Sequence, residues 1–526
     1  MRFFRDGGVI LDTTLPYYIS TCFDSNELKN LQWAQADNTM YLVDGTDKPQ
    51  KLTRTAHTEW TIEDANIITG AFLPANTSDT VIRPSATTGT ITLMSNSNIW
   101  YSSHIGSLWQ INQPLSAVTY TGTLNANESS IQTAYFKGAY GFTTTGTFSA
   151  TVTLERSTNS GISWSAALTP LTDTNFDNPT EEEDGAIYRV TMSSFSSGSC
   201  DYTLTVSNQT NNGVVRIASY VDGNEVTATV LTALSSTAST KDWREGYWSN
   251  RRGWPKTVCF HQQRLIFGGS YNFPQTIWFG EANPDDYDNF DDGTDDTDSF
   301  TMAIPGQNPI RWLLSQDYLL IGTSSSCGKY GEQGKAITPT TPNYQEQSRY
   351  GSANIRAILA GDAILYVERG GTKVREFAYN LQYDKYLSPD LTLLSENIAN
   401  SGVIDIDFQM KPYPVLWCTL NDGDIATLTY QREQEVVSWS VQNTLGDFSN
   451  TAIIPTDAYE DEVWCKVKRT INGTDKYYIE QFQPLDWNDD VNDLWFLDSA
   501  LKYDGAATTS FSGLDHLEGE NVSVYA

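Results

Sequence analysis

The feature that most constrains the fold of this chain is the return of one short apolar strand pattern. Leu416-Trp417-Cys418 and Val463-Trp464-Cys465 stand 47 residues apart. Comparable runs precede them at residues 264–269, 319–322 and 364–367, with an early member at 37–43. A repeat of about 45 to 55 residues with several short strands is typical of β-propeller blades, which bury their faces against one another. The pattern therefore predicts an all-β propeller. A series of independent sandwiches is the alternative that it leaves open.

Two hairpins can be read directly from their turn residues. Asn421-Asp422-Gly423-Asp424 separates apolar runs at 415–420 and 425–430, and Asn472-Gly473 separates 462–470 from 477–482. Asp-Gly and Asn-Gly are the pairs that tight hairpin turns prefer. Hardly any long stretch has helical periodicity, so we expect short antiparallel strands throughout.

The middle of the chain has a different composition. Between Trp109 and Lys241, Thr and Ser become dense, charge falls and apolar residues alternate, as in residues 147–154. About 120 residues of this kind predict an inserted immunoglobulin-like β-sandwich. Its loop at residues 157–164 resembles the Asp-box of sialidases, with Asn159 in the aspartate position. Such loops generally stabilise hairpin turns rather than carry catalysis.

Together these patterns predict four regions. They are N-terminal β elements that contribute to the propeller (1–115), the inserted sandwich (116–240), the propeller blades (241–500) and the start of a truncated C-terminal β region (501–526). We expect missing segments at both ends, because the chain opens within one apparent strand and stops while another is forming.

The charge limits the partners. With 33 Lys and Arg against 64 Asp and Glu, the formal net charge is −31. Tight, sequence-tolerant nucleic-acid binding comes from basic residues that displace counterions, so this charge argues against it. It fits a protein that touches DNA without sticking to it, and equally an ordinary soluble protein. No run approaches the roughly 18 apolar residues of a membrane span, and no cleavable export signal is visible.

The cysteines predict neither disulfides nor a zinc centre. Six cysteines are scattered without a C-x-x-C pair, and three lie within apolar runs around Cys259, Cys418 and Cys465. Free Cys in such runs behaves as a small hydrophobe. We expect reduced, buried thiols, folding in a cytoplasm, and no cofactor.

One segment concentrates negative charge. Eight carboxylates fall within fourteen residues that hold no Lys or Arg: Asp285, Asp286, Asp288, Asp291, Asp292, Asp295, Asp296 and Asp298. The calcium loop of EF-hands fails as a template, because with Gly293 at the glycine position Phe290 falls on a ligand position and Ser299 stands where Glu is required. We predict a solvated acidic loop and no metal ligands, with a looser calcium site as the alternative.

Nothing in the sequence predicts an enzyme. The four histidines lie in no Gly-x-Ser-x-Gly or His-Glu-x-x-His context, and no catalytic residue can be named. The one compact basic and aromatic segment holds Arg251, Arg252 and Trp254. It is a candidate partner contact. The alternative is that the arginine pair anchors a loop against nearby acids.

Residues 252–270 resemble a signature of short-tailed bacteriophage tail nozzle proteins, the family of tail tubular protein B and DNA stabilisation proteins. The stretch reads Arg-Gly-Trp-Pro-Lys-Thr-Val-Cys-Phe-His-Gln-Gln-Arg-Leu-Ile-Phe-Gly-Gly-Ser. Further matches agree with the family's order. They lie before this stretch at 34–37, 40–43 and 49–54, and after it at 274–279, 286–290, 351–352, 365–371, 374–376, 428–434 and Trp439. The resemblance covers most of residues 30–70 and 245–485.

The resemblance implies a structural virion protein. Such proteins are ring-forming propellers, normally homo-hexamers, below the portal and its adaptor, assembled in the bacterial cytoplasm. Their channel retains the genome and conducts double-stranded DNA into the host. An acidic lumen would repel phosphates and let DNA slide, which makes the Asp285–Asp298 loop a candidate for the channel or the ring edge. The alternative is a host-glycan-binding or glycan-cleaving propeller, since sugars stack on exposed aromatic rings.

Overall fold

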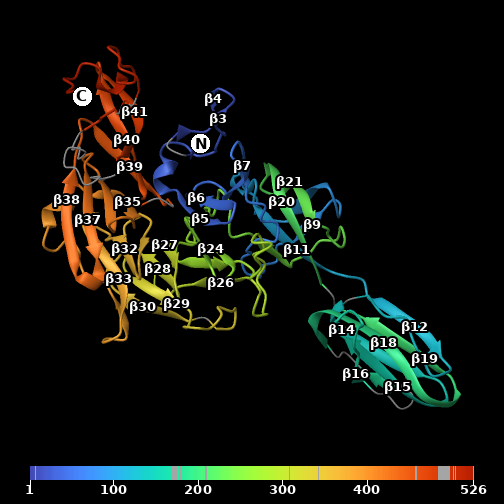
Figure 1. The fold of residues 1–526 in the computed structure, drawn as a ribbon. Helices are drawn as coiled ribbons and strands as arrows, with labels where there is room; N and C mark the ends of the chain where they lie inside the picture. Colours follow the sequence, from blue (N-terminus) through green and yellow to red (C-terminus); the bar gives the residue numbers. More distant parts are fainter. Residues whose placement is uncertain are drawn as a thin grey trace. The chain divides into compact units, whose positions relative to one another are not determined.

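The computed structural model describes the chain apart from residues 6–7, 135, 169–173, 177–179, 208–209, 307, 342, 457–458, 484–497, 502, 504 and 525–526. The described residues form strands joined by turns and short 3₁₀ segments such as η1 (Glu27–Asn30) (Figure 1). They divide into two compact units. Unit 1 holds residues 1–71 and 250–526, and unit 2 holds residues 72–249. The expected all-β class is confirmed.

Unit 1 is a succession of small antiparallel sheets, each built from strands that are consecutive in the chain. In Figure 1 they run from the blue β5 and β6 through the yellow β28 to the red β40. Five have four strands and the last has three: β5 (Gln32–Ala36), β6 (Thr39–Val43), β7 (Gln50–Ala56), β8 (Glu59–Asp64); β23 (Thr257–His261), β24 (Arg264–Gly268), β25 (Thr276–Phe279), β26 (Phe300–Ala303); β27 (Ile310–Ser315), β28 (Leu319–Thr323), β29 (Cys327–Tyr330), β30 (Tyr344–Ser348); β31 (Ile358–Ala360), β32 (Ala363–Val367), β33 (Val374–Asn380), β34 (Lys385–Leu387); β35 (Val403–Gln409), β36 (Val415–Leu420), β37 (Ile425–Gln431), β38 (Val436–Gln442); β39 (Asp447–Ile454), β40 (Glu462–Ile471), β41 (Thr474–Phe482).

Neighbouring sheets pack through apolar side chains. The first strands contact one another from β5 to β23, β23 to β27, β31 to β35 and β35 to β39. Four apolar clusters of unit 1 each bridge two successive sheets; one, for example, joins Phe279 of β25 to Leu319 of β28. The second strands β24, β28 and β32 are buried along their whole length, which explains why the apolar runs recur. This is the blade packing of a propeller-like fold.

The predicted hairpins have the expected turns. β36 and β37 flank Asp422 and Gly423, and β40 and β41 flank Asn472 and Gly473. Asn472 and Gly473 have φ values of 50° and 74°. Two consecutive positive φ angles are what a type I′ turn requires, and Asn and Gly adopt them at low cost.

Unit 2 contains two groups of strands. A six-stranded sheet has the order β22–β11–β20–β21–β10–β9. Its buried side chains include Trp100, Trp109 and Ile217. The strands are β9 (Ile82–Pro84), β10 (Thr90–Ser95), β11 (Leu108–Pro114), β20 (Thr210–Asp222), β21 (Glu225–Thr232) and β22 (Trp243–Glu245).

The second group is a β-sandwich within residues 118–206. It is shorter than the expected region 116–240, because residues 210–232 form β20 and β21 of the six-stranded sheet. β12, β19, β14 and β17 pair on one side, and β13, β18, β15 and β16 on the other; the long β18 joins the two sides by pairing with β14. Phe142 and Leu204 from one side share a core with Val152 and Leu154 from the other. The strands are β12 (Val118–Leu124), β13 (Glu128–Ser129), β14 (Phe136–Thr145), β15 (Phe148–Ser157), β16 (Ser165–Leu168), β17 (Thr174–Phe176), β18 (Thr180–Gly198) and β19 (Cys200–Val206).

The two units divide the chain differently from the regions expected from composition. Residues 72–115, expected with the propeller, lie in unit 2. The reason is strand pairing across a long separation: β11 pairs with β20, with Leu108 opposite Arg216, and β10 pairs with β21.

All six cysteines are free, and five are buried. Burial raises the pKa of Cys465 and Cys327 to about 12 each, so these thiols are protonated at neutral pH. Cys22 is exposed, which differs from the expectation that all the thiols are buried. Across the described residues, no helix has both the length and the apolar character that a membrane crossing needs.

Candidate functional site

The Asp-rich segment is the connection between the third and fourth strands of its sheet, β25 and β26. Tyr287 of this connection packs against Phe260 of β23, with ring centroids 4.9 Å apart, so the segment lies beside the strand that contacts the first sheet. Five carboxylates are exposed, namely Asp285, Asp286, Asp292, Asp295 and Asp296, and three are partly buried, namely Asp288, Asp291 and Asp298. The loop presents a dense negative surface at the rim of the sheet.

A buried arginine holds this loop in place. Arg264 of β24 is 2% exposed. Its Nη1 donates to the carbonyls of Gly280, Thr297 and Asp298 at 2.8, 3.1 and 2.7 Å, and its Nη2 donates to the carbonyl of Asp296 at 2.6 Å. Charge-assisted bonds of this kind are the strong ones. The buried guanidinium thus holds the backbone of the acidic loop, while most of the loop's carboxylates face solvent.

Asp288 links the loop to the first sheet. Its Oδ1 accepts a hydrogen bond from the Tyr41 hydroxyl at 2.8 Å, and its Oδ2 lies 3.1 Å from Lys51 Nζ. Burial, followed by the Asp288 charge, raises the pKa of Tyr41, which is therefore a neutral donor. None of the eight aspartates belongs to a group of three carboxylates close enough to share an ion in the described part of the chain. The geometry gives the calcium alternative for this loop no support.

The predicted partner contact is a packed loop. Trp254 is 6% exposed, and its Nε1 donates to Asn250 Oδ1 at 2.8 Å. The carbonyl of Arg252 accepts the backbone N–H of Asn272 at 3.0 Å. Arg251 and Arg252 are partly buried. The indole is therefore largely buried, and Arg251 and Arg252 remain partly accessible to a partner.

Three charged residues and one tryptophan that the sequence pattern did not single out lie on or beside the first strands of their sheets. We call this set the first-strand site, and it consists of Trp33, Arg356, Asp405 and Asp407. The Arg356 guanidinium lies 4.4 Å from the centre of the Trp33 ring, which is a cation–π contact. Asp405 Oδ2 accepts from Asn450 Nδ2 at 3.3 Å, and Asp407 Oδ2 accepts from the backbone N–H of Ile453 at 2.7 Å.

Both carboxylates of the first-strand site have raised pKa values. Burial, with the Asp407 charge added, raises the pKa of Asp405 to about 6. Burial also raises the pKa of Asp407. Backbone hydrogen bonds and the Arg356 charge lower this pKa and offset part of the rise. A sequence signal existed: two aspartates two residues apart in the apolar run 403–409 must share one face of a strand. The site can exchange a proton near neutral pH.

We expect Asp405→Asn to stabilise the protein at pH 7.5 and to have no effect at pH 4. Because the folded pKa lies above the ordinary value of 3.8, the native state holds the proton more tightly, and ionisation costs stability as pH rises through about 4 to 6. The whole shift corresponds to at most about 3 kcal/mol. Solvent screening at this partly exposed side chain reduces the expected gain to about 1 kcal/mol.

Thermal unfolding between pH 4 and 8 measures this difference. Asp362→Asn, at an exposed turn, is the matched control and should leave the pH profile unchanged. An Asp405→Asn variant that gains nothing at pH 7.5, or whose gain is independent of pH, would contradict the assignment.

Three acidic side chains converge at another point of unit 1. Carboxylate oxygens of Glu27, Asp44 and Asp47 lie within 4.8 Å of one another. Glu27 begins η1, and Asp44 and Asp47 lie in the connection from β6 to β7. Burial, then the charges of Asp44 and Glu27, raises the pKa of Asp47. Nothing in the sequence singles out this group, since the pairing of β5 with β6 brings it together.

The sandwich contains a Tyr–Glu pair, the feature that a sialidase would need. Glu181 accepts from Arg156 at 2.5 and 2.7 Å and from the Tyr188 hydroxyl at 2.5 Å. Glu181 and Tyr188 are 3% and 2% exposed. Groups so deeply buried cannot reach a glycan, so we interpret this network as structural.

The Asp-box-like loop is a hairpin turn, as expected. It joins β15 to β16; the Ser157 hydroxyl accepts the N–H of Gly161 and the Asn159 side chain accepts that of Ser163, both at 2.9 Å. Trp164 Nε1 donates to the Gly161 carbonyl at 3.0 Å. Every contact of Asn159 here serves the turn.

The histidines lie in different environments. His261 Nδ1 lies 2.8 Å from Ser315 Oγ, and burial lowers the pKa of this imidazole to about 4, so it is neutral at pH 7. His104 packs against the rings of Trp100 and Trp109. His57 and His516 lie elsewhere in unit 1.

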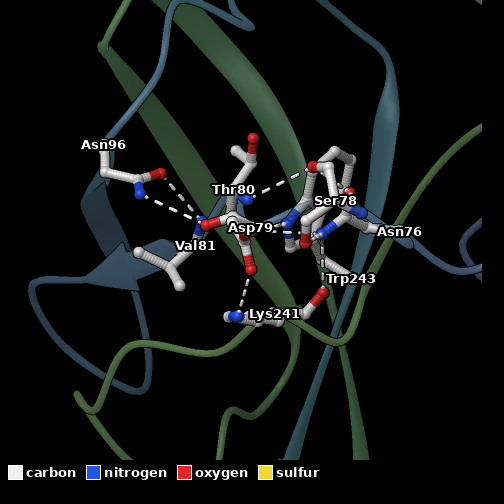
Figure 2. Close-up of polar contacts among 8 residues, drawn as sticks. All are labelled: Asn76, Ser78, Asp79, Thr80, Val81, Asn96, Lys241 and Trp243. Atoms are coloured by element: carbon white, nitrogen blue, oxygen red, sulfur yellow. Dashed lines mark hydrogen bonds and ion pairs between the residues drawn. The ribbon is translucent and has the colours of Figure 1, made fainter.

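A polar network fixes the segment that leads into β9 of unit 2. Figure 2 shows the Asn76 amide at its centre, donating to the carbonyls of Ser78, Thr80 and Lys241 at 3.1, 3.1 and 3.0 Å. Lys241 Nζ lies 2.6 Å from Asp79 Oδ1, and this ammonium lowers the pKa of the exposed Asp79. These side chains bond to one another and to the backbone, so the network stabilises a loop.

Comparison with known proteins adds little. No family model and no curated protein matches the sequence. Among solved structures, a crystal structure of a protein from Lactobacillus plantarum is similar over 53% of this chain and 80% of its own length, with 12% sequence identity and a TM-score of 0.29. A likeness at that TM-score supports no conclusion about fold or function.

Proposed function

We propose that this chain is the subunit of a phage tail nozzle: a non-enzymatic, ring-forming virion protein that retains and conducts double-stranded DNA below the portal and adaptor. The proposal rests on the family resemblance, and the propeller-like packing of the sheets of unit 1 supports it further. The matching stretches lie in three of these sheets: 252–270 spans the β23–β24 hairpin, 365–371 begins in β32, and 428–434 begins in β37.

The electrostatics suit such a conduit. A surface carrying the exposed aspartates of the β25–β26 loop, in a chain of net charge −31, repels phosphates instead of displacing their counterions. DNA can then pass without being bound. Assembly into rings follows from the symmetry of heterologous contacts, which close into cyclic oligomers when the rotation allows.

We expect the purified chain to form rings of about six copies with a central hole, and to retain no double-stranded DNA even at about 50 mM salt. Light scattering followed by negative-stain imaging of the largest species tests the ring, and a gel-shift experiment tests the DNA. A clean trimer would count against the nozzle and favour the host-attachment alternative, which a glycan array would then examine. Tight DNA binding at moderate salt would contradict the sliding surface.

A further inference from the structure

The acidic group of unit 1 has a feature that like charges alone do not explain. Asp44 is 5% exposed. Its Oδ1 accepts the backbone N–H groups of Thr46 and Asp47 at 2.9 and 2.8 Å. Its Oδ2 is buried and has no hydrogen-bond partner. A buried carboxylate oxygen without a donor is costly, so a native structure normally supplies a partner.

No protein cation fills that role in the described part of the chain. The carboxylate oxygens of Glu27, Asp44 and Asp47 lie within 4.8 Å of one another. The nearby Lys48 is directed to Asp64, 2.8 Å from its Oδ2. Glu27 uses Oε2 to accept the N–H of Asp24 at 2.5 Å, which leaves Oε1 for another partner. Three acids at this spacing repel one another unless a positive charge lies between them.

We propose that Glu27, Asp44 and Asp47 bind one divalent cation, with Ca²⁺ as the ion that fits best. Asp44 Oδ2 is the oxygen left for the metal, since Oδ1 is held by its own loop. The ligands are all carboxylate oxygens, which hard cations prefer, and Ca²⁺ tolerates several carboxylates and irregular geometry better than Mg²⁺ does. Zinc would favour nitrogen or sulfur ligands.

The ion would join two segments that are separate in the sequence. Glu27 precedes β5, and Asp44 and Asp47 follow β6. The cation would therefore link the segment before β5 to the connection between β6 and β7. This inference does not depend on the nozzle proposal, because it concerns the chain whatever the ring conducts.

The test uses the full chain after chelator treatment. Isothermal titration with CaCl₂ should give one site per chain, and about 5 mM Ca²⁺ should raise the midpoint of thermal unfolding by about 3 °C or more. Glu27→Gln and Asp47→Asn should each lower the affinity at least about tenfold and abolish the Ca²⁺-dependent shift. Without Ca²⁺ both variants should be at least as stable as the parent, because they remove repulsion.

The matched control is Glu63→Gln, an exposed carboxylate on β8, which should keep the full response. The proposal is overturned if the parent binds neither Ca²⁺ nor Mg²⁺, or if Glu27→Gln and Asp47→Asn bind Ca²⁺ as the parent does. Stoichiometric binding of Zn²⁺ alone, lost in Cys22→Ser, would also overturn it, because the Cys22 thiol interacts with Asp47 and would then supply a zinc ligand. Folding of the variants can be judged in chelator, so a negative titration remains interpretable.

Discussion

Replacing Arg264 by methionine is expected to cost about 3 to 5 kcal/mol of folding free energy, because the change leaves buried polar groups without a partner. Four carbonyls, those of Gly280, Asp296, Thr297 and Asp298, lose their donor together. The carboxylates of the β25–β26 loop also lose the buried guanidinium beneath them. Chemical denaturation measures the loss, and limited proteolysis should cut within residues 285–298 before the rest of unit 1.

Arg264→Lys is the informative control. Lysine keeps the charge but has a compact ammonium that cannot reach four carbonyls as the guanidinium does. We expect an intermediate stability and partial protection of the loop. If the free energy of unfolding of Arg264→Met lies within about 1 kcal/mol of the parent's, the Arg264 side chain is not what holds the acidic loop.

Glu181→Gln should destabilise the sandwich by about 3 kcal/mol and leave unit 1 untouched. The change keeps the shape of the side chain but puts an amide where Arg156 and Tyr188 need an acceptor. Breaking a buried pair from one side leaves its partner uncompensated, which is why the cost is large. Calorimetry should show one transition moving to lower temperature. Among the described residues, the sandwich core draws only on the range 120–206, so the other transitions should stay in place.

The same sheet offers a matched control. Glu155 lies 2.7 Å from Arg189, and both side chains are about a quarter exposed, at 22% and 27%. Pairs that water can reach contribute little, so Glu155→Gln should cost less than about 1 kcal/mol. Equal losses in the two variants, or a shift of every transition by Glu181→Gln, would refute the interpretation of Glu181 as a local support of the sandwich.

The strand repeat could be predicted because the runs that make it visible share one structural position. Residues 264–269, 319–322, 364–367, Leu416-Trp417-Cys418 and Val463-Trp464-Cys465 all coincide with the second strand of a sheet. In β24, β28 and β32 that strand is buried along its whole length and is apolar for that reason. In β40 only alternate residues are buried. Local patterns also gave the hairpins, since Asp-Gly and Asn-Gly specify their own turns.

Pairing between strands that are distant in the sequence leaves no recognisable local pattern. β11 and β20 are separated by the whole sandwich, yet they are neighbours in one sheet, and nothing local distinguishes Leu108 as the partner of Arg216. For the same reason the convergence of Glu27 with Asp44 and Asp47 was invisible, as was the approach of Arg356 to Trp33. The Asp-rich run was conspicuous in the sequence, but the buried arginine that organises it is one of many in the composition.

The sandwich begins and finishes at paired strands. Val118, the first residue of β12, lies opposite Val206, the last of β19; in the six-stranded sheet Pro114, the last residue of β11, lies opposite Thr210, the first of β20. Opposite residues of antiparallel strands are only about 5 Å apart. The interval between Pro114 and Thr210 can therefore be spanned by a short turn, which makes the sandwich an exchangeable cassette. Removing or replacing this module would leave the register between β11 and β20 of the six-stranded sheet unchanged.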